Sequence, residues 1–307
     1  MANAKPYRIK TISEFHRLRG LPKPEHPLIS VVDYAAFKPT SKINPPSWVL
    51  DFYSISLKRD LSTTKLKYGQ QEYDFDEGVM FFISPGQLFQ IKVEENPSSE
   101  RSGWMSNIHP DFLWNTPLAK TIKQYEFFDY SVNEALFLSE KEEATITGLV
   151  QNIQQEYHAN IDRFSQNIII AQIELLLTYA ERFYHRQFIT RKRTNHEMLN
   201  RLEEILAEYF NSDDLVEKGL PTVQSIAEAL RVSPNYLSGL LKVLTGQSTQ
   251  QHIHDKLIEK AKEKLSTTDL SVTEIAYELG FEYLQSFSKF FKIKTNLSPS
   301  EFRQSFH

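Results

Sequence analysis

The chain has 307 residues, which is enough for two domains of ordinary size. Apolar residues make up 40% and charged residues 24%, as in soluble globular proteins, and the absence of cysteine excludes disulfides, thiolate zinc sites and a cysteine nucleophile. No segment approaches the roughly 20 apolar residues of a membrane helix. The N-terminus lacks the apolar segment of a secretory signal, so we expect a cytoplasmic protein.

The net charge of -4 argues weakly against nucleic-acid binding, because many DNA-binding domains are basic. Residues 196–307 carry 12 Lys and Arg against 16 Asp and Glu, so the C-terminal part is acidic as well. Only the tail 281–307 is basic, with four Lys and Arg against two Glu. Any DNA binding must therefore depend on where the cations lie.

The first ~135 residues are predicted to be rich in β-strands. Short apolar runs at 29–32, 48–57, 79–83 and 88–93 are separated by turn residues such as Pro85-Gly86. Regular short strands of this kind indicate a barrel or a sandwich.

Two helices are predicted next. Ser139 and Glu142 form a capping box, so a helix should run from there to about His158. A second helix should cover about 163–186, and its centre at 168–177 is apolar nearly all round. Such a helix needs cover on more than one face. The helix is either buried within its own domain or forms part of a dimer interface. The two alternatives are compatible with each other.

A polar, basic stretch at 190–196 is predicted to be the linker between a domain at 1–189 and a domain at 197–307. The triplet Arg191-Lys192-Arg193 is either solvated surface or an arm that contacts DNA. From Met198 onward every apolar stripe has helical spacing.

The strongest feature of the sequence is an internal duplication. Residues 226–232 align with 275–281 at an offset of 49, and after one inserted residue the match resumes at an offset of 50. Each copy predicts a short helix with an alanine at Ala227 or Ala276, a tight turn and a second helix. This is the pattern of a helix-turn-helix, and Gly280 suits a left-handed turn.

The second helix of each copy presents a polar outer face. The first copy offers Asn235, Ser238, Gly239 and Lys242, and the second offers Gln285, Ser288, Lys289 and Lys292. Any amphipathic helix has a polar face, but two copies in register favour helices that enter the DNA major groove. A helix predicted at 249–265 is ~25 Å long and could hold the two DNA-contacting helices about one turn of DNA apart.

Residues of about 196–307 resemble the DNA-binding domain of AraC/XylS-type transcriptional regulators. The motif is Ile275-Ala276-x-x-Leu279-Gly280-Phe281, followed by Phe287-Ser288-x-x-Phe291-Lys292 and Ser298-Pro299-x-x-Phe302-Arg303. The resemblance implies seven helices, with recognition helices at about 234–244 and 283–292. The implied DNA-binding residues are Asn235, Tyr236, Ser238, Gly239, Lys242, Gln285, Ser286, Ser288, Lys289 and Lys292.

Two positions depart from that family's pattern. Gly239 stands where many members have a longer polar side chain, which weakens direct base reading by the first helix. Asn296 replaces the usual glycine after the second copy, and because asparagine tolerates a left-handed backbone, we expect the turn to form.

The segment 73–87 resembles the cupin-like sensor barrel of the same family, which implies a small-molecule effector and a homodimer. Candidate pocket residues are Trp48, Phe52, Phe81, Phe89 and Trp104, with ordinary barrel core as the alternative. A cupin enzyme would hold a metal with histidines. Because His16, His26 and His109 lack ligand spacing and fit surface or capping roles, we expect no metal. No Ser-His-Asp arrangement, phosphate loop or paired acid is evident in the sequence, so we expect no cofactor and no catalytic residue.

The predicted fold class is α+β, with an N-terminal cupin-like β-barrel and two dimerisation helices before a C-terminal all-α double helix-turn-helix domain. The predicted function is a sequence-specific DNA-binding transcriptional regulator controlled by an effector in the barrel, with no membrane partner. The alternative is a metal-free small-molecule binding protein or enzyme whose helix-turn-helix domain is degenerate.

Overall fold

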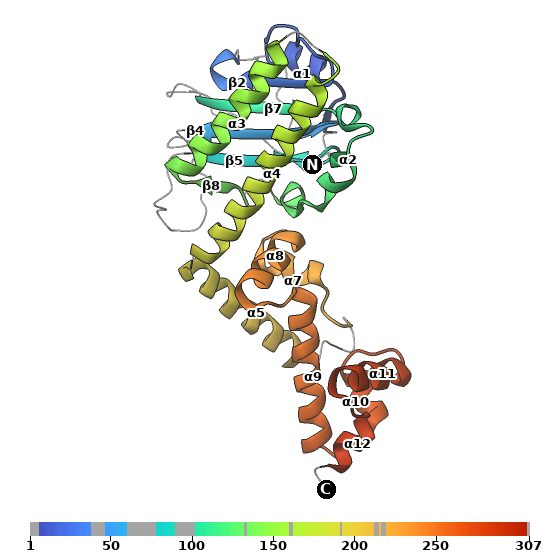
Figure 1. The fold of residues 1–307 in the computed structure, drawn as a ribbon. Helices are drawn as coiled ribbons and strands as arrows, with labels where there is room; N and C mark the ends of the chain where they lie inside the picture. Colours follow the sequence, from blue (N-terminus) through green and yellow to red (C-terminus); the bar gives the residue numbers. More distant parts are fainter. Residues whose placement is uncertain are drawn as a thin grey trace. The chain divides into compact units, whose positions relative to one another are not determined.

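The computed structural model describes residues 6–37, 47–59, 78–89, 102–131, 134–159, 162–190, 192–211, 215 and 219–305 (Figure 1). The chain divides into two compact units, Met1–Gln187 and Phe188–His307. The segment that resembles a sensor barrel is described only from Gly78 onward, and Arg191 lies outside the described residues. No described helix is long and apolar enough to cross a membrane.

The first unit is built on an antiparallel five-stranded sheet with the order β2-β7-β4-β5-β8. Its strands are β2 (Ile29–Asp33), β4 (Tyr53–Arg59), β5 (Gly78–Ile83), β7 (Ser102–Ile108) and β8 (Leu136–Leu138). In β4, Ile55 and Leu57 alternate with Ser54 and Ser56, so the two faces of the sheet differ in polarity.

A smaller sheet with the order β1-β3-β6 lies in the same unit. It contains β1 (Tyr7–Ile9), β3 (Trp48–Leu50) and β6 (Leu88–Phe89), and it packs with α1 (Ile12–Leu18) around Phe15 and Phe52. The described strands therefore form two sheets, and the closed barrel predicted from the sequence is not seen among them.

The edge of β8 shows one physical reason why the sheet does not continue there. Gln187 accepts a hydrogen bond from the Phe137 N–H at 2.9 Å and donates one to the Ala135 carbonyl oxygen at 3.2 Å. The Gln187 side chain of the helix thus binds the backbone N–H and carbonyl groups with which a further strand would pair.

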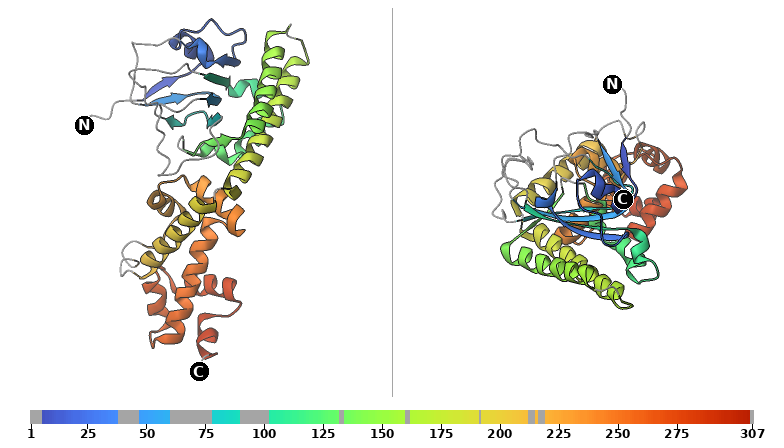
Figure 2. Two further views of the ribbon diagram at one scale, coloured as in Figure 1. Left: turned by 90° about the vertical axis from the view of Figure 1, so that its left-hand side faces the viewer. Right: turned by 90° about the horizontal axis from the view of Figure 1, so that it is seen from above.

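Helices α3 (Glu140–His158) and α4 (Ser165–Thr190) cover one face of the five-stranded sheet (Figures 1 and 2). The capping box of Ser139 and Glu142 is confirmed, because both of its hydrogen bonds are present. Arg186 binds the Glu142 carboxylate at 2.6 and 3.0 Å and donates to the Phe137 carbonyl oxygen, which joins the two helices to β8.

The second unit is helical. Its described helices are α5 (Lys192–Asn211), α7 (Val223–Leu230), α8 (Pro234–Thr245), α9 (Thr249–Thr267), α10 (Val272–Glu278), α11 (Leu284–Thr295) and α12 (Pro299–Gln304). One hydrophobic core runs through α5 and both copies of the repeat, with α9 in its middle. Because α4 reaches Thr190 and α5 begins at Lys192, the stretch predicted as a linker is mostly helical.

Candidate nucleic-acid interface

The first helix-turn-helix consists of α7 and α8. Ile226 and Ala227 of α7 are buried, and the helix ends at Arg231, whose φ of 59° is left-handed. The Val232 N–H donates to the Ala227 carbonyl oxygen at 3.0 Å, which closes the turn. Ser233 then caps α8 by accepting a hydrogen bond from the Tyr236 N–H at 3.2 Å.

The second helix-turn-helix consists of α10 and α11 and repeats this geometry. Ile275 and Ala276 are buried, and the Phe281 N–H donates to the Ala276 carbonyl oxygen at 3.0 Å. The left-handed residue at this turn is Gly280, with a φ of 81°. The two copies found in the sequence therefore form the same backbone hydrogen bond at their turns.

Each recognition helix ends on a left-handed residue. Gly246 ends α8 with a φ of 75°, and Asn296 ends α11 with a φ of 64°. The expectation that asparagine preserves this turn is confirmed, since the Asn296 N–H donates to the Lys292 carbonyl oxygen as the Gly246 N–H does to that of Lys242.

The outer face of α8 offers few groups for base contact. Asn235 and Gly239 are half-buried and Lys242 is exposed, whereas the Ser238 hydroxyl lies 3.0 Å from that of Thr249.

The prediction that Tyr236 contacts DNA is corrected by its burial. Tyr236 is 8% exposed and lies four residues before the buried Leu240, and its ring meets that of Phe188 edge-on at 5.2 Å. Its ring therefore belongs to the core of the unit.

The outer face of α11 is richer in exposed groups. Gln285, Ser286, Lys289 and Lys292 are exposed and Ser288 is half-buried. On the opposite side Phe287 and Phe291 are fully buried and fix the orientation of the helix. The geometry therefore presents two exposed lysines and an exposed amide on one side of the second recognition helix.

Two exposed residues near the helix starts were missed by the sequence reasoning. Tyr283 directly precedes α11 and is 64% exposed, and Arg231 is exposed in the turn before α8. Their position in the sequence could have revealed both residues, because side chains at the start of a recognition helix reach base edges and phosphates.

The candidate effector residues do not line one pocket among the described residues. Trp48, Phe52 and Phe89 belong to the core around α1, while Phe81 clusters with Val79 and Ala135. In the sheet register, Trp104 is opposite Leu57 and Phe81 is opposite Ser56, so the two side chains lie on opposite faces.

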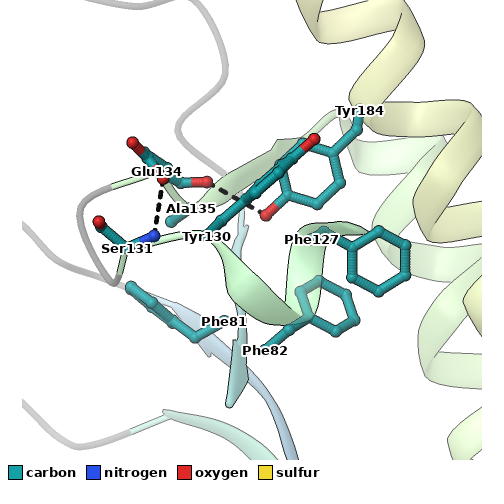
Figure 3. Close-up of a pocket in the computed structure, with 8 residues that line it drawn as sticks. All are labelled: Phe81, Phe82, Phe127, Tyr130, Ser131, Glu134, Ala135 and Tyr184. Atoms are coloured by element: carbon teal, nitrogen blue, oxygen red, sulfur yellow. Dashed lines mark hydrogen bonds between the residues drawn. The ribbon is translucent and has the colours of Figure 1, made fainter. Parts of the chain in front are cut away.

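Phe81 lines a cavity of about 10 Å³ together with Phe82, Phe127, Tyr130, Ser131, Glu134, Ala135 and Tyr184 (Figure 3). The Tyr184 hydroxyl donates to the Glu134 carbonyl oxygen at 3.1 Å, and the Tyr184 ring stacks on Phe127. A space of this size is large enough for at most one water molecule and too small for an organic effector.

The histidines of the first unit have structural roles. The His26 Nδ1 accepts from the Leu28 N–H, and the His109 side chain caps the helical turn η2 (Pro110–Leu113). His16 is buried and not at the surface, and burial lowers its pKa although its hydrogen bond to the Pro22 carbonyl oxygen opposes the shift. Within the described ranges, no group of three His, Asp or Glu could hold a metal ion.

Comparison with known proteins gives a family-model match within the second unit. Residues 226–305 match a family model described as a helix-turn-helix domain. The chain is 36% identical over 86 residues to the uncharacterized HTH-type transcriptional regulator YijO of Escherichia coli (strain K12). The aligned residues make up 28% of the chain and 30% of YijO. The chain thus spans less than a third of that relative's length.

Two further similarities differ in how much of the chain they cover. The uncharacterized HTH-type transcriptional regulator YfiF of Bacillus subtilis (strain 168) is 25% identical over 241 residues, covering 76% of the chain and 71% of YfiF. A structure of the C-terminal domain of AraT, a response regulator from Geobacillus stearothermophilus, is 32% identical over 35% of the chain and 84% of that domain, with a TM-score of 0.31.

A duplicated helix-turn-helix, with a recognition helix on each side of one long connecting helix, is the organisation of a DNA-binding domain. The second unit has this organisation, with α8 and α11 joined through α9. Together with the helix-turn-helix family match and the similarity to HTH-type regulators, it supports the resemblance of this unit to the DNA-binding domain of AraC/XylS-type transcriptional regulators.

Proposed function

We propose that this protein regulates transcription by binding paired sites in double-stranded promoter DNA with α8 and α11. The observation that carries the proposal is the repeated turn, in which Val232 bonds Ala227 and Phe281 bonds Ala276 in the same way. The connecting helix α9 has 19 residues and is therefore ~28 Å long, close to one turn of DNA. A regulator of this kind works where the chromosome lies, so we place it in the cytoplasm.

The two recognition helices contribute unequally in this proposal. In α11, Gln285 can pair with a base edge while Lys289 and Lys292 reach guanine or phosphate. In α8, Gly239 has no side chain, the Ser238 hydroxyl lies 3.0 Å from that of Thr249, and only Lys242 of the four outer-face positions is exposed. We expect α11 to provide most of the sequence preference.

Dimerisation is proposed through α4. Phe164, just before the helix, and Ile168 and Leu175 within it are 50%, 45% and 44% exposed, and Ala171 is exposed between them. Their spacing of four, three and four residues matches the apolar stripe of a coiled coil. The opposite side of α4 is buried within the first unit, so this stripe is suited to a second copy of the chain.

Control by a small-molecule effector in the β-rich first unit is the remaining part of the proposal. Ser30, Asn107 and Ser54 lie opposite one another on β2, β7 and β4 and are at most 1% exposed. Within the described part of the chain, the two hydroxyl oxygens and both amide atoms of Asn107 have no hydrogen-bond partner. An unpaired buried polar group costs about 1–3 kcal/mol, which a polar effector could offset.

The experiment that tests the proposal is selection of bound sequences from a random DNA library with the purified full-length protein. We expect a defined motif, which Gln285→Ala should relax, whereas Lys289→Ala should lower the recovery of all bound DNA. Lys141→Ala, which removes a lysine from α3 in the first unit, is the charge-matched control. Failure to enrich any motif at low salt, with and without candidate effectors, would contradict sequence-specific binding.

A further inference from the structure

A cleft of about 340 Å³ lies in the first unit where four elements meet, away from the candidate effector residues. It is lined by residues from the start of β2, from η2, from the end of α3 and from the start of α4. Its volume lies within the range of small-molecule sites, ~300–1,000 Å³. None of Trp48, Phe52, Phe81, Phe89 and Trp104 lines it.

The walls of the cleft are held in place by hydrogen bonds between elements distant in sequence. The Tyr157 hydroxyl of α3 accepts from the Glu25 N–H at 2.6 Å and from the His26 N–H at 3.4 Å. Gln166 of α4 donates to the Phe112 carbonyl oxygen of η2 at 2.7 Å. The cleft is therefore preformed, which lowers the cost of binding a ligand.

The lining combines an apolar surface with an excess of negative charge. Its apolar and aromatic members are Leu28, Ile29, Phe112, Tyr157 and Ile169. Its charged members are Asp111, Glu156, Asp162 and Arg163, which is three carboxylates against one guanidinium. Burial lowers the pKa of His26, which favours the neutral form of its ring.

Two of the three carboxylates remain available to a ligand. Asp162 is engaged, because it accepts from the Phe164 and Ser165 N–H groups at 2.7 and 3.1 Å. The Glu156 carboxylate has no hydrogen bond or ion pair with any described residue. Among the described residues, the Asp111 carboxylate is paired only with the His109 Nδ1, at 3.5 Å. The guanidinium of Arg163 lies over the Phe164 ring, 4.5 Å from its centre.

We propose that this cleft binds a small organic ammonium compound with an apolar body. The ammonium group lies between Glu156 and Asp111, and the apolar body rests against Leu28, Phe112 and Ile169. The site is separate from the effector site proposed for the β-rich part of the unit, and the inference does not depend on DNA binding.

The test is isothermal titration of the full-length protein with 2-phenylethylamine, which is protonated at neutral pH. 3-Phenylpropionate, of similar size and opposite charge, is the ligand control. We expect saturable binding of the amine with a dissociation constant of about 1 mM and no binding of the acid. Absence of amine binding up to about 20 mM, or equal binding of both compounds, would overturn the proposal.

Two variants locate the binding. Glu156→Gln should weaken amine binding about three- to tenfold, because it removes one partly exposed charge partner while keeping the shape of the side chain. Glu181→Gln removes an exposed carboxylate from α4, 16 residues beyond Ser165, and should leave binding unchanged. An unchanged dissociation constant for Glu156→Gln would place the ligand elsewhere and refute the assignment. Circular dichroism of each variant checks that the fold is retained.

Discussion

Two glycines of the second unit have the same backbone conformation but different surroundings, which makes them a matched pair for substitution. Gly280 and Gly246 have left-handed φ values of 81° and 75°. A Cβ at Gly246 would meet no atom within 4 Å, whereas a Cβ at Gly280 would lie 3.2 Å from the Leu215 carbonyl oxygen and 3.3 Å from the carbonyl carbon of Gly219. Alanine at Gly280 therefore adds crowding to the backbone strain that both sites share.

The expected costs follow from these distances. Gly246→Ala should lower the free energy of unfolding by about 1 kcal/mol, the cost of a left-handed alanine. Gly280→Ala should cost about 2–3 kcal/mol, because backbone atoms must also move by a few tenths of an ångström. The difference of about 1–2 kcal/mol corresponds to a clear shift of the urea midpoint. The reason is that the free energy of unfolding of such a unit falls by about 1–3 kcal/mol for each molar of urea.

The assay is urea unfolding of the full-length protein, followed by far-ultraviolet circular dichroism and by tryptophan fluorescence. All three tryptophans, Trp48, Trp104 and Trp114, lie in the first unit, so fluorescence reports that unit alone. The helical signal should shift in both variants while the fluorescence transition stays in place. Equal shifts for the two variants would refute the role of the contact with Leu215, and a shifted fluorescence transition would show that the effect is not confined to the second unit.

Three further outcomes are expected. Lys289→Ala should reduce the slope of log affinity against log salt by about 0.9 and weaken binding to all DNA sequences alike, if this lysine contacts a phosphate. Leu175→Glu should convert a dimer to a monomer in sedimentation, because it places a charge in the exposed stripe of α4. Phe291→Ala should lower the free energy of unfolding by about 3–5 kcal/mol, because the ring is fully buried.

Each of these variants has a control in the same chain. Lys141→Ala should leave the salt slope unchanged, and a slope equal to that of Lys289→Ala would contradict a phosphate contact. Gln155→Glu adds the same charge at an exposed site on α3 and should not alter the sedimentation of the dimer. Ile293→Ala, at a side chain 67% exposed, should change stability by less than about 0.5 kcal/mol, and a larger loss would place Ile293 in an interface.

The sequence by itself determined the helix-turn-helix geometry, because that geometry is local. Ala227 and Ala276 marked the first helices, and the spacing from each to its turn residue fixed the bonds to Val232 and Phe281. Helix caps and left-handed residues act within a few positions of one another, so their residue types can be read directly. Asn296 is the clearest case, since an asparagine at the position of the family's usual glycine predicted its left-handed conformation.

Only the tertiary structure decided which residues of a helix or strand are available to a ligand. Tyr236 carries a polar hydroxyl at a plausible DNA-facing position, yet the ring of Phe188 holds it in the core. The strand pairing of the first unit, and the cleft between Phe112, Tyr157 and Ile169, join segments far apart in the chain. Such contacts depend on register and packing between distant segments, which residue periodicity along one segment does not encode.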